Sequence, residues 1–523
     1  MLTILTTILL FAAFAADCGV LTLYFVHMLQ LNSYRPERYL RWMKENRALL
    51  VQKMGWMVLA FLAVAAFLLT PTDWRVRGAC AALLIIHCIL NLPKKAKKPL
   101  VFTARVKRLL VTHALLLIPV GLAVYFTGMV RLSVGLLFLW PILTPLVTLL
   151  ANGINHPLEA AISRHYVKDA RRRLEEMPRL ITVGITGSYG KTSTKNFLNA
   201  LLSVKYNVLM TPESYNTTMG VVRTVRERLR PTHEVFIAEM GAKKPGDIRE
   251  ICDLVHPRYG MITSIGEQHL ETFKTVENIV KTKFELADAV PSDGTVFLNA
   301  DNGYIRDCRD GVSAPTVTYG TAEDGEADYR ASDVAVDGTG CAFTVTSPDG
   351  EACRFSTKLL GAHNIQNITG CIAVAHTLGI PLKELIAPVR RLKPVEHRLQ
   401  LLPNGFIDDA YNSNPAGFRA ALDVLKGFEG QRVLVTPGMV ELGERQEALN
   451  RELGGYAAGC CDYAVLVGEK QAPPLKEGLL AAGFPEERLY VAKTLQDGLA
   501  WVNGLPSVEK RTVLLENDLP DNF

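Results

Sequence analysis

Long apolar runs dominate the first 151 residues, and the rest of the chain alternates shorter apolar runs with polar segments. A helix that spans a membrane needs about 20 mostly apolar residues. Stretches that approach this requirement cover residues 2–29, 49–70, 77–92, 109–126 and 130–151, and the third is the shortest. No basic segment precedes the first run, and Asp17 stands where signal cleavage needs a small residue, so we expect an uncleaved helix. The pattern predicts an N-terminal α-helical membrane region of about five helices.

Basic residues are unevenly shared among the loops between these runs. The first loop carries Arg35, Arg38, Arg41, Lys44 and Arg47, and the third carries Lys94, Lys95, Lys97, Lys98, Arg105, Lys107 and Arg108. The second and fourth loops hold only one or two basic residues each. Because Lys and Arg concentrate in cytoplasmic loops, the N-terminus is expected outside and residues 152–523 in the cytoplasm, where ATP is present. The chain is thus predicted to be a multi-pass protein of the cell membrane.

Three ionisable residues, Asp17, His87 and His113, lie within or beside these apolar runs. Such groups are costly in a membrane and often functional. A hydrogen bond between helices, or a position at the membrane interface, is the more frequent explanation. Nothing near them resembles a complete transport pathway.

Residues 152–179 form a polar, basic connector after the last apolar run. Its apolar positions Leu158, Ile162 and Val167, together with Arg171–Arg173, indicate a helix with one apolar face. Two interpretations remain open: an amphipathic helix on the anionic inner leaflet, or a solvated helix that merely connects two regions.

From residue 180 onward the pattern changes to short β-type runs separated by helical segments. The runs cover residues 180–185, 235–238, 260–264, 295–298, 432–436 and 463–467. Alternating strands and helices predict a doubly wound, mainly parallel sheet. Residues 315–360 alternate over shorter runs with turns at Asp337-Gly338 and Asp349-Gly350, which indicates antiparallel hairpins within this α/β domain. A hinge near residues 392–403 is expected to precede a second α/β domain.

Composition and charge exclude several classes of protein. The hydrophobic fraction of 49% and charged fraction of 21% are those of a folded protein. The ten cysteines include no CxxC pair, so we expect neither a zinc knuckle nor a disulfide framework. A net charge of +5 is too small to indicate nucleic acid as a partner.

The strongest chemical motif follows the β-type run at residues 180–185. The glycines of Thr186-Gly187-Ser188-Tyr189-Gly190 let backbone N–H groups approach phosphates, Lys191 can reach the terminal phosphates, and Thr192 can bind Mg²⁺. Ile185 occupies the position where a strict Walker A motif has glycine. A Gly-Lys-Thr sequence between a strand and a helix nevertheless predicts a nucleotide phosphate loop, with ATP and Mg²⁺ as its ligands.

Two further residues follow predicted strands. Glu239 ends one β-type run and His269 follows another. At the ends of parallel strands they can hold a second Mg²⁺ or position phosphoryl oxygens, although either alone is as well explained by a surface role.

Seven segments occur in the order GITGSYGKTSTK, EMGAKKPGDI, HLETFKTVENIVKTKFEL, LNADN, GAHNIQN, EHRL and IDDAYNSNP. Together they resemble the Mur ligases, the ATP-dependent ligases that build the peptide of bacterial cell walls. The likeness covers about residues 180–520 and is greatest to the branch that adds D-alanyl-D-alanine to a UDP-muramoyl tripeptide. It implies a central ATP-binding domain over residues 180–398, a C-terminal Rossmann-like domain over 399–523, and an acid–amino-acid ligase that forms ADP and phosphate.

The resemblance also assigns roles to individual residues. The phosphate loop would comprise Gly187, Ser188, Gly190, Lys191, Thr192 and Ser193, and metal would be held by Thr192, Glu239, His269 and a carbamylated Lys283. Nucleotide-side positions would be Asn299, Asp301, Asn364 and Asn367, with Arg398 of the linker reaching the γ-phosphate and Asp409 the ribose. Lys191, Glu239, His269, Lys283 and Arg398 form the expected catalytic set, and Asn216 and Thr217 the substrate-facing segment.

Two departures from the family pattern leave the substrates open. The apolar region takes the place of the UDP-binding N-terminal domain, so the cell-wall peptide precursor is UDP-linked or lipid-linked, at a membrane lipid surface. The family's Gly-Asp-Met motif is here Pro437-Gly438-Met439, so the amine can be an amino acid or a dipeptide such as D-alanyl-D-alanine. The alternatives are a polymer synthase of the poly-γ-glutamate type and, in another class, a membrane transporter or regulator switched by ATP.

Overall fold

A computed structural model of the chain forms two compact units, residues 1–164 with 520–523 and residues 165–519. Each unit is described by itself. The structure describes residues 2–50, 53, 74–93, 98–127, 130–268, 270–322, 326–411, 413–440, 442–468 and 472–518.

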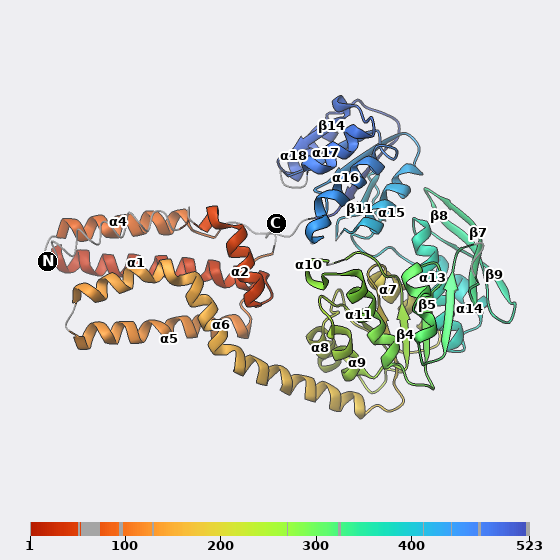
Figure 1. Cartoon of the computed structure of the whole chain (residues 1–523), viewed down its shortest axis with the longest axis horizontal. Coiled ribbons are helices and arrows are strands. Elements are labelled where there is room, and N and C mark those ends of the chain that lie inside the picture. Colours follow the sequence, from red (N-terminus) through yellow and green to blue (C-terminus); the bar gives the residue numbers. More distant parts are fainter. Residues whose placement is uncertain are drawn as a thin grey trace. The chain divides into compact units, whose positions relative to one another are not determined.

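The first unit is helical, as predicted. Its elements are α1 (Leu2–Leu31), α2 (Pro36–Glu45), α4 (Trp74–Leu90), α5 (Ala104–Thr127) and most of α6 (Val130–Glu175) (Figure 1). Four of the predicted apolar runs fall on α1, α4, α5 and α6, while most of the run at 49–70 lies outside the described residues. Among the described residues one helix, Ile4–Leu31, is long and apolar enough to cross a membrane. A helical region with one such span is therefore what the structure supports.

Asp17 and His87 join α1 to α4 inside this unit. His87 Nδ1 lies 2.6 Å from Asp17 Oδ1, and both side chains are buried. His87 Nε2 lies 2.6 Å from the carbonyl oxygen of Lys53. A buried polar group needs partners, so the expectation of a hydrogen bond between helices is confirmed for this pair. His113 is also buried, and its ring nitrogens have no partner within the described part of the chain.

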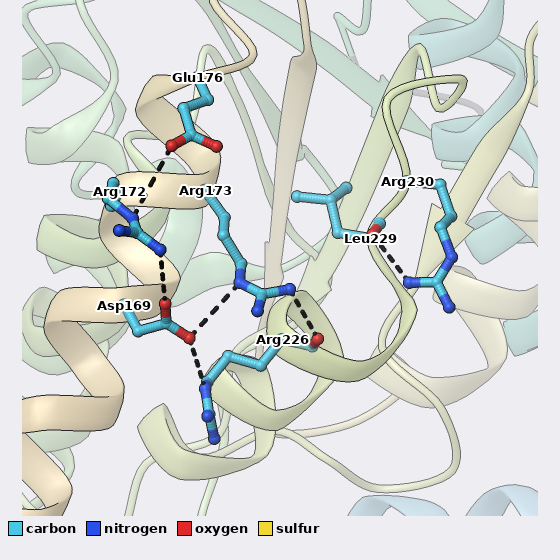
Figure 2. A network of polar contacts seen from close by, with 7 residues as sticks. All are labelled: Asp169, Arg172, Arg173, Glu176, Arg226, Leu229 and Arg230. Carbon is cyan, nitrogen blue, oxygen red and sulfur yellow. Dashed lines mark hydrogen bonds and ion pairs between the residues drawn. The ribbon is translucent and has the colours of Figure 1, made fainter.

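The C-terminal end of α6 belongs to the second unit, where it packs on α8 (Thr218–Arg228). Figure 2 shows the polar contacts that hold it: Arg226 Nε donates to Asp169 Oδ2 at 2.7 Å, and Arg172 and Arg173 contact the same carboxylate. Val167 packs against the buried core of this unit. This end of the connector is therefore a docked helix, because a protein surface takes the apolar face that the sequence also allowed for a membrane.

A nine-stranded sheet forms the centre of the second unit, in the order β2-β3-β1-β4-β5-β6-β7-β8-β9. Its strands are β1 (Ile181–Thr186), β2 (Val208–Met210), β3 (Val235–Glu239), β4 (Tyr259–Ile262), β5 (Thr295–Asn299), β6 (Thr316–Gly320), β7 (Tyr329–Asp337), β8 (Gly340–Thr346) and β9 (Ala352–Thr357). Pairing is parallel from β2 through β7 and antiparallel from β7 to β9. The predicted hairpins are therefore present, and they extend the main sheet.

Helices cover both faces of this sheet (Figure 1). One face packs on α7 (Lys191–Leu202), α13 (Ala362–Thr377) and α14 (Leu382–Arg390), and the other on α8, α9 (Asp247–Val255) and α11 (Val276–Ala289). Two short helices, α10 (Leu270–Phe273) and α12 (Gly303–Arg306), follow β4 and β5. Burial on both faces explains why a strand such as β3 is an unbroken apolar run up to its last residue, Glu239.

The C-terminal part has its own six-stranded sheet, in the order β10-β11-β15-β12-β13-β14. The strands are β10 (Gln400–Leu401), β11 (Phe406–Asp409), β12 (Gln431–Thr436), β13 (Tyr463–Val467), β14 (Leu489–Ala492) and β15 (Arg511–Glu516). All pair in parallel except β10. The helices are α15 (Pro415–Lys426), α16 (Gln446–Ala457), α17 (Ala472–Ala481) and α18 (Leu495–Asn503). The second α/β domain is confirmed.

Candidate active site

The loop that the motif predicts to bind phosphate lies between β1 (Ile181–Thr186) and α7 (Lys191–Leu202). Gly187 and Gly190 have φ angles of 153° and 77°, which residues with a side chain rarely adopt. A Cβ atom on Gly187 would lie 2.1 Å from Thr263 Oγ1, and one on Gly190 would lie 2.8 Å from Asn367 Oδ1. Both glycines are therefore required, because neighbouring chain approaches the loop this closely.

Hydrogen bonds hold the loop to the segment after β4 and to Lys191, the first residue of α7. Ser188 Oγ donates to the carbonyl oxygen of Gly266 at 3.0 Å, which ties the loop to the segment after β4. Lys191 Nζ donates to the carbonyl oxygens of Gly187 at 2.6 Å and Ser188 at 3.1 Å. Ser193 is partly buried within α7. The ammonium thus lies directly over the loop that would surround phosphate oxygens.

The pKa of Lys191 is lowered to about 8, chiefly by burial; the charge of Glu239 opposes this fall and the positive charge of Arg398 adds to it. A bound polyphosphate would add negative charge beside this amine and favour its protonated form. The lysine is therefore placed to gain a full positive charge when the site is filled.

Glu239 is the centre of a buried polar cluster at the end of β3. Its Oε1 accepts hydrogen bonds from Thr192 Oγ1 at 3.1 Å and Asn216 Nδ2 at 3.0 Å. Its Oε2 forms an ion pair of 2.9 Å with Lys195 Nζ. Burial alone would raise the pKa of Glu239, but Lys195 and Lys191 hold it below its usual value. An ionised carboxylate beside a threonine hydroxyl is a donor set that suits Mg²⁺.

Lys195 is a site residue that the motif did not reveal. Its side chain is about 1% exposed, and besides Glu239 it hydrogen-bonds the carbonyl oxygen of Glu213. It thereby links α7 to the segment that carries Asn216. The available signal was its position four residues after Lys191, which places both lysines on one face of α7.

Lys283 lies on α11 and is buried. Burial and the charge of Lys191 lower its pKa well below the usual value, against smaller opposing effects of Glu285 and Asp247. His269, the other expected metal ligand, lies outside the described residues. In the part of the chain that the structure describes, no three His, Cys, Asp or Glu side chains gather as a metal-binding group.

Asn299 and Asp301, expected on the nucleotide side, support the loops around the site. Asn299 Nδ2 donates to the carbonyl oxygen of Thr263 at 2.7 Å. Asp301 accepts hydrogen bonds from both Thr321 N and Thr321 Oγ1, from Ala322 N and from Gln366 Nε2, at 2.6–3.1 Å. These contacts connect the ends of β5 and β6 to α13.

The first turns of α13 bring Asn367 against Gly190 of the phosphate loop. Asn364 Nδ2 donates to the carbonyl oxygen of Leu360 at 2.8 Å. The neighbouring His363 has its pKa lowered to about 4 by burial, so its ring is neutral at physiological pH. The expected pair is thus placed beside the phosphate loop, although only Asn367 contacts it.

Arg398 and Asp409 lie together where the linker meets the C-terminal sheet. The Arg398 guanidinium stacks over the Tyr411 ring at 4.3 Å, and Asp409 Oδ1 accepts a hydrogen bond from Leu399 N at 3.1 Å. Burial raises the pKa of Asp409 to about 6, and the charge of Arg398 opposes that rise. These contacts fix the positions of both side chains at the end of the linker.

Comparison with known proteins agrees with this arrangement. The model of the Mur ligase middle domain matches residues 185–375, and that of the Mur ligase glutamate ligase domain matches residues 397–515. The UDP-N-acetylmuramoyl-tripeptide–D-alanyl-D-alanine ligase of Escherichia coli is 31% identical over 329 residues, which cover 61% of this chain and 72% of that protein. The chain belongs to the Mur ligase family.

A second ligase of the same name and two solved structures of MurF are also similar to this chain. The enzyme of that name from Haemophilus influenzae is 32% identical over 55% of this chain and 65% of its own length. Among solved structures, MurF from Acinetobacter baumannii superposes with a TM-score of 0.62 at 27% identity, covering 68% of this chain and 77% of that one. MurF from Thermotoga maritima, solved with ADP, gives 0.60 at 25% identity and covers 68% and 80%. The chain is therefore an ATP-dependent amide ligase of the Mur type, and both family models begin after its helical N-terminal region.

Proposed function

We propose that this Mur ligase is a membrane-bound peptide ligase of cell-wall precursor synthesis. It would join an amino acid or a dipeptide such as D-alanyl-D-alanine to the carboxylate of a muramoyl peptide. The observation that carries the proposal is the phosphate loop with Lys191 over it and Thr192 bound to the buried Glu239. The reaction class is that of the ligases from Escherichia coli and Haemophilus influenzae to which the chain is similar.

The chemistry requires activation of the acceptor carboxylate. ATP phosphorylates it to an acyl phosphate and leaves ADP, and the amine then forms the C–N bond as phosphate leaves and a proton is released. Mg²⁺ held by Thr192 and Glu239, with His269 and Lys283 at a second position, would offset negative charge on the phosphates. Lys191 would bind the transferring group, and Arg398 would approach from the linker as the C-terminal domain closes over the acyl phosphate.

Lys283 would act as a carbamate rather than as an ammonium. Its burial lowers the pKa, which raises the fraction of neutral amine able to add CO₂. Addition forms one N–C bond, releases one proton and converts the side chain into an anion. We expect protein equilibrated with ¹³C-bicarbonate to give a ¹³C carbamate signal that Lys283→Met removes. The same variant should lower kcat by about 100-fold or more.

Lys281→Met is the matched control, because Lys281 is exposed on the same helix two residues away. It should keep both the carbamate signal and the activity. A carbamate signal that persists in Lys283→Met, or normal activity without any signal, would contradict this role.

The helical unit would be a multi-pass membrane domain with its N-terminus outside and both α/β domains in the cytoplasm. The uneven distribution of Lys and Arg among the loops supports this orientation. Exposed apolar side chains on α1, α4, α5 and α6, which include Ile8, Ile89, Leu115 and Leu146, support contact with lipid.

One experiment tests the ligase proposal and identifies its substrates. The detergent-purified full-length protein would receive ATP and Mg²⁺ with UDP-muramoyl tripeptide or its lipid-linked counterpart, each with and without D-alanyl-D-alanine. We expect one phosphate released per product, and a product heavier by the dipeptide less one water. A ladder of glutamate additions would instead indicate the polymer synthase, and ATP turnover that ignores every acceptor would favour the transporter or regulator.

A further inference from the structure

The end of α1 is bound to the start of α5 by a compact set of polar contacts. His27 Nε2 lies 2.8 Å from the carbonyl oxygen of Lys98. Gln30 exchanges two hydrogen bonds with the backbone of Val101, at 2.9 and 3.0 Å, and also donates to Tyr34 Oη at 3.0 Å. The first turn of α5 is thereby fixed beside the loop that joins α1 to α2.

Arg105 occupies the centre of this arrangement. Its guanidinium lies over the Tyr34 ring at 3.9 Å. Its Nη2 makes a long contact of 3.4 Å with Asn152 Oδ1, while Asn152 Nδ2 donates to the Tyr34 carbonyl oxygen at 3.1 Å. Asn152 is about 5% exposed, so the group that orients the guanidinium is itself fixed by burial. Stacking and one amide thus hold the arginine in a defined orientation.

The charge of Arg105 is only partly balanced by the described residues, because the carboxylate of Glu159 acts on it from beyond ion-pair distance. No carboxylate in the described part of the chain forms an ion pair with it, and its Nε is buried without a hydrogen-bond partner there. The nearby Arg108 instead binds Glu159 through two hydrogen bonds of 2.7 and 2.9 Å. A guanidinium has five N–H donors and pairs best with carboxylate or phosphate. A buried donor without a partner is costly, so this geometry points to a missing anion.

The side chains around Arg105 indicate which kind of molecule would carry this anion. Val101, Phe102 and Val111 next to Arg105 on the chain are each more than half exposed, as is Leu150 on α6. Lys107 and the exposed basic residues of α2, Arg41 and Lys44, add positive charge at this end of the unit. A cation at the border between an exposed apolar surface and a basic one suits an amphiphile with an anionic head.

We propose that Arg105, with Tyr34 and Asn152, binds a phosphate group carried on a lipid. This inference rests on the membrane part of the proposed function and makes its acceptor more specific: a lipid phosphate or diphosphate would bring the substrate to this unit. The arginine would bind two phosphate oxygens through its planar fork of N–H groups, while stacking on the Tyr34 ring fixes the orientation of that plane.

The test uses the full-length protein in uncharged maltoside micelles, with bound molecules counted by native mass spectrometry. The probes are farnesyl diphosphate, phosphatidylglycerol and inorganic pyrophosphate. We expect Arg105→Gln to weaken binding of a lipid probe about tenfold or more, and Lys107→Gln, an exposed neighbour on the same helix, to weaken it less than about twofold. Arg105→Lys should fall between them, since it keeps the charge but loses the planar fork.

The probes separate the sources of the phosphate. Arg105-dependent binding of farnesyl diphosphate supports an isoprenoid-linked molecule, and the same dependence with phosphatidylglycerol supports a phospholipid head group. Equal losses in Arg105→Gln and Lys107→Gln, or Arg105-dependent binding of inorganic pyrophosphate that is tighter than that of either lipid, would overturn the proposal. Unchanged helical circular dichroism and unchanged elution in maltoside show that the helical unit of each variant is folded. The experiment measures binding of the probes and does not measure ligation. A negative result therefore overturns the Arg105 site and leaves the ligase proposal to its own test.

Discussion

Lys191→Ala is expected to abolish ligation, lowering kcat/KM by about 1,000-fold or more, without unfolding the protein. In the structure the ammonium bonds only the loop carbonyl oxygens of Gly187 and Ser188 among described partners, so truncation removes no buried carboxylate partner. The loop keeps the hydrogen bond from Ser188 Oγ to the Gly266 carbonyl oxygen, which does not involve this side chain. The loss should therefore come from phosphate binding in the transition state, and acceptor-dependent phosphate release measures it.

Lys205→Ala is the matched control for that experiment. Lys205 lies just beyond the other end of the same helix and donates to the carbonyl oxygens of Leu378 and Gly379. It should retain ligation within about twofold. Ligation by Lys191→Ala at a rate near that of the unmodified enzyme would refute the phosphate-loop assignment, whatever the fate of the acceptor hypothesis.

The strand, turn and helix that carry the proposed phosphate loop could be predicted because their signal is local. A β-type run, two glycines, Lys-Thr and a helix are consecutive, and the strand and helix flanking them form where expected. Six strands of the parallel sheets, β1, β3, β4, β5, β12 and β13, were equally readable, since burial on both faces makes them short apolar runs. The strands β2, β11, β14 and β15 were not predicted. Of these, β2 (Val208–Met210) has only three residues, too few for any pattern.

Contacts between distant segments could not be read in the same way. The ion pair of Lys195 with Glu239 joins positions that are 44 residues apart. The sequence around either residue does not indicate that the two side chains pair. The apolar face of the connector has the same pattern whether it meets lipid or protein, and only the packing of Val167 and the Asp169–Arg226 bond assign its end to the second unit. Likewise, the four hydrogen bonds that Asp301 accepts come from α13 and from the chain after β6, so its supporting role is visible only in three dimensions.

Glu239→Gln is expected to lose ligation and also to destabilise the protein by about 3 kcal/mol. The substitution leaves the Lys195 ammonium buried without its anionic partner, and both side chains of that pair are about 1% exposed. For the second unit this corresponds to a fall of roughly 4 °C in Tm, measured on the full-length protein in detergent. Glu234→Gln, at the exposed residue just before the same strand, should change stability by less than about 0.5 kcal/mol.

A double variant separates the structural role of Glu239 from its chemical role. Removing both charges in Glu239→Gln/Lys195→Met should recover most of the lost Tm, because replacing a buried ion pair by uncharged groups is often nearly neutral. Ligation should remain at least about 100-fold below the unmodified enzyme, since a neutral amide cannot replace a carboxylate beside the Thr192 hydroxyl as a metal ligand. Recovery of activity together with stability would instead show that Glu239 serves only to neutralise the charge of Lys195. Other residues would then have to bind the metal.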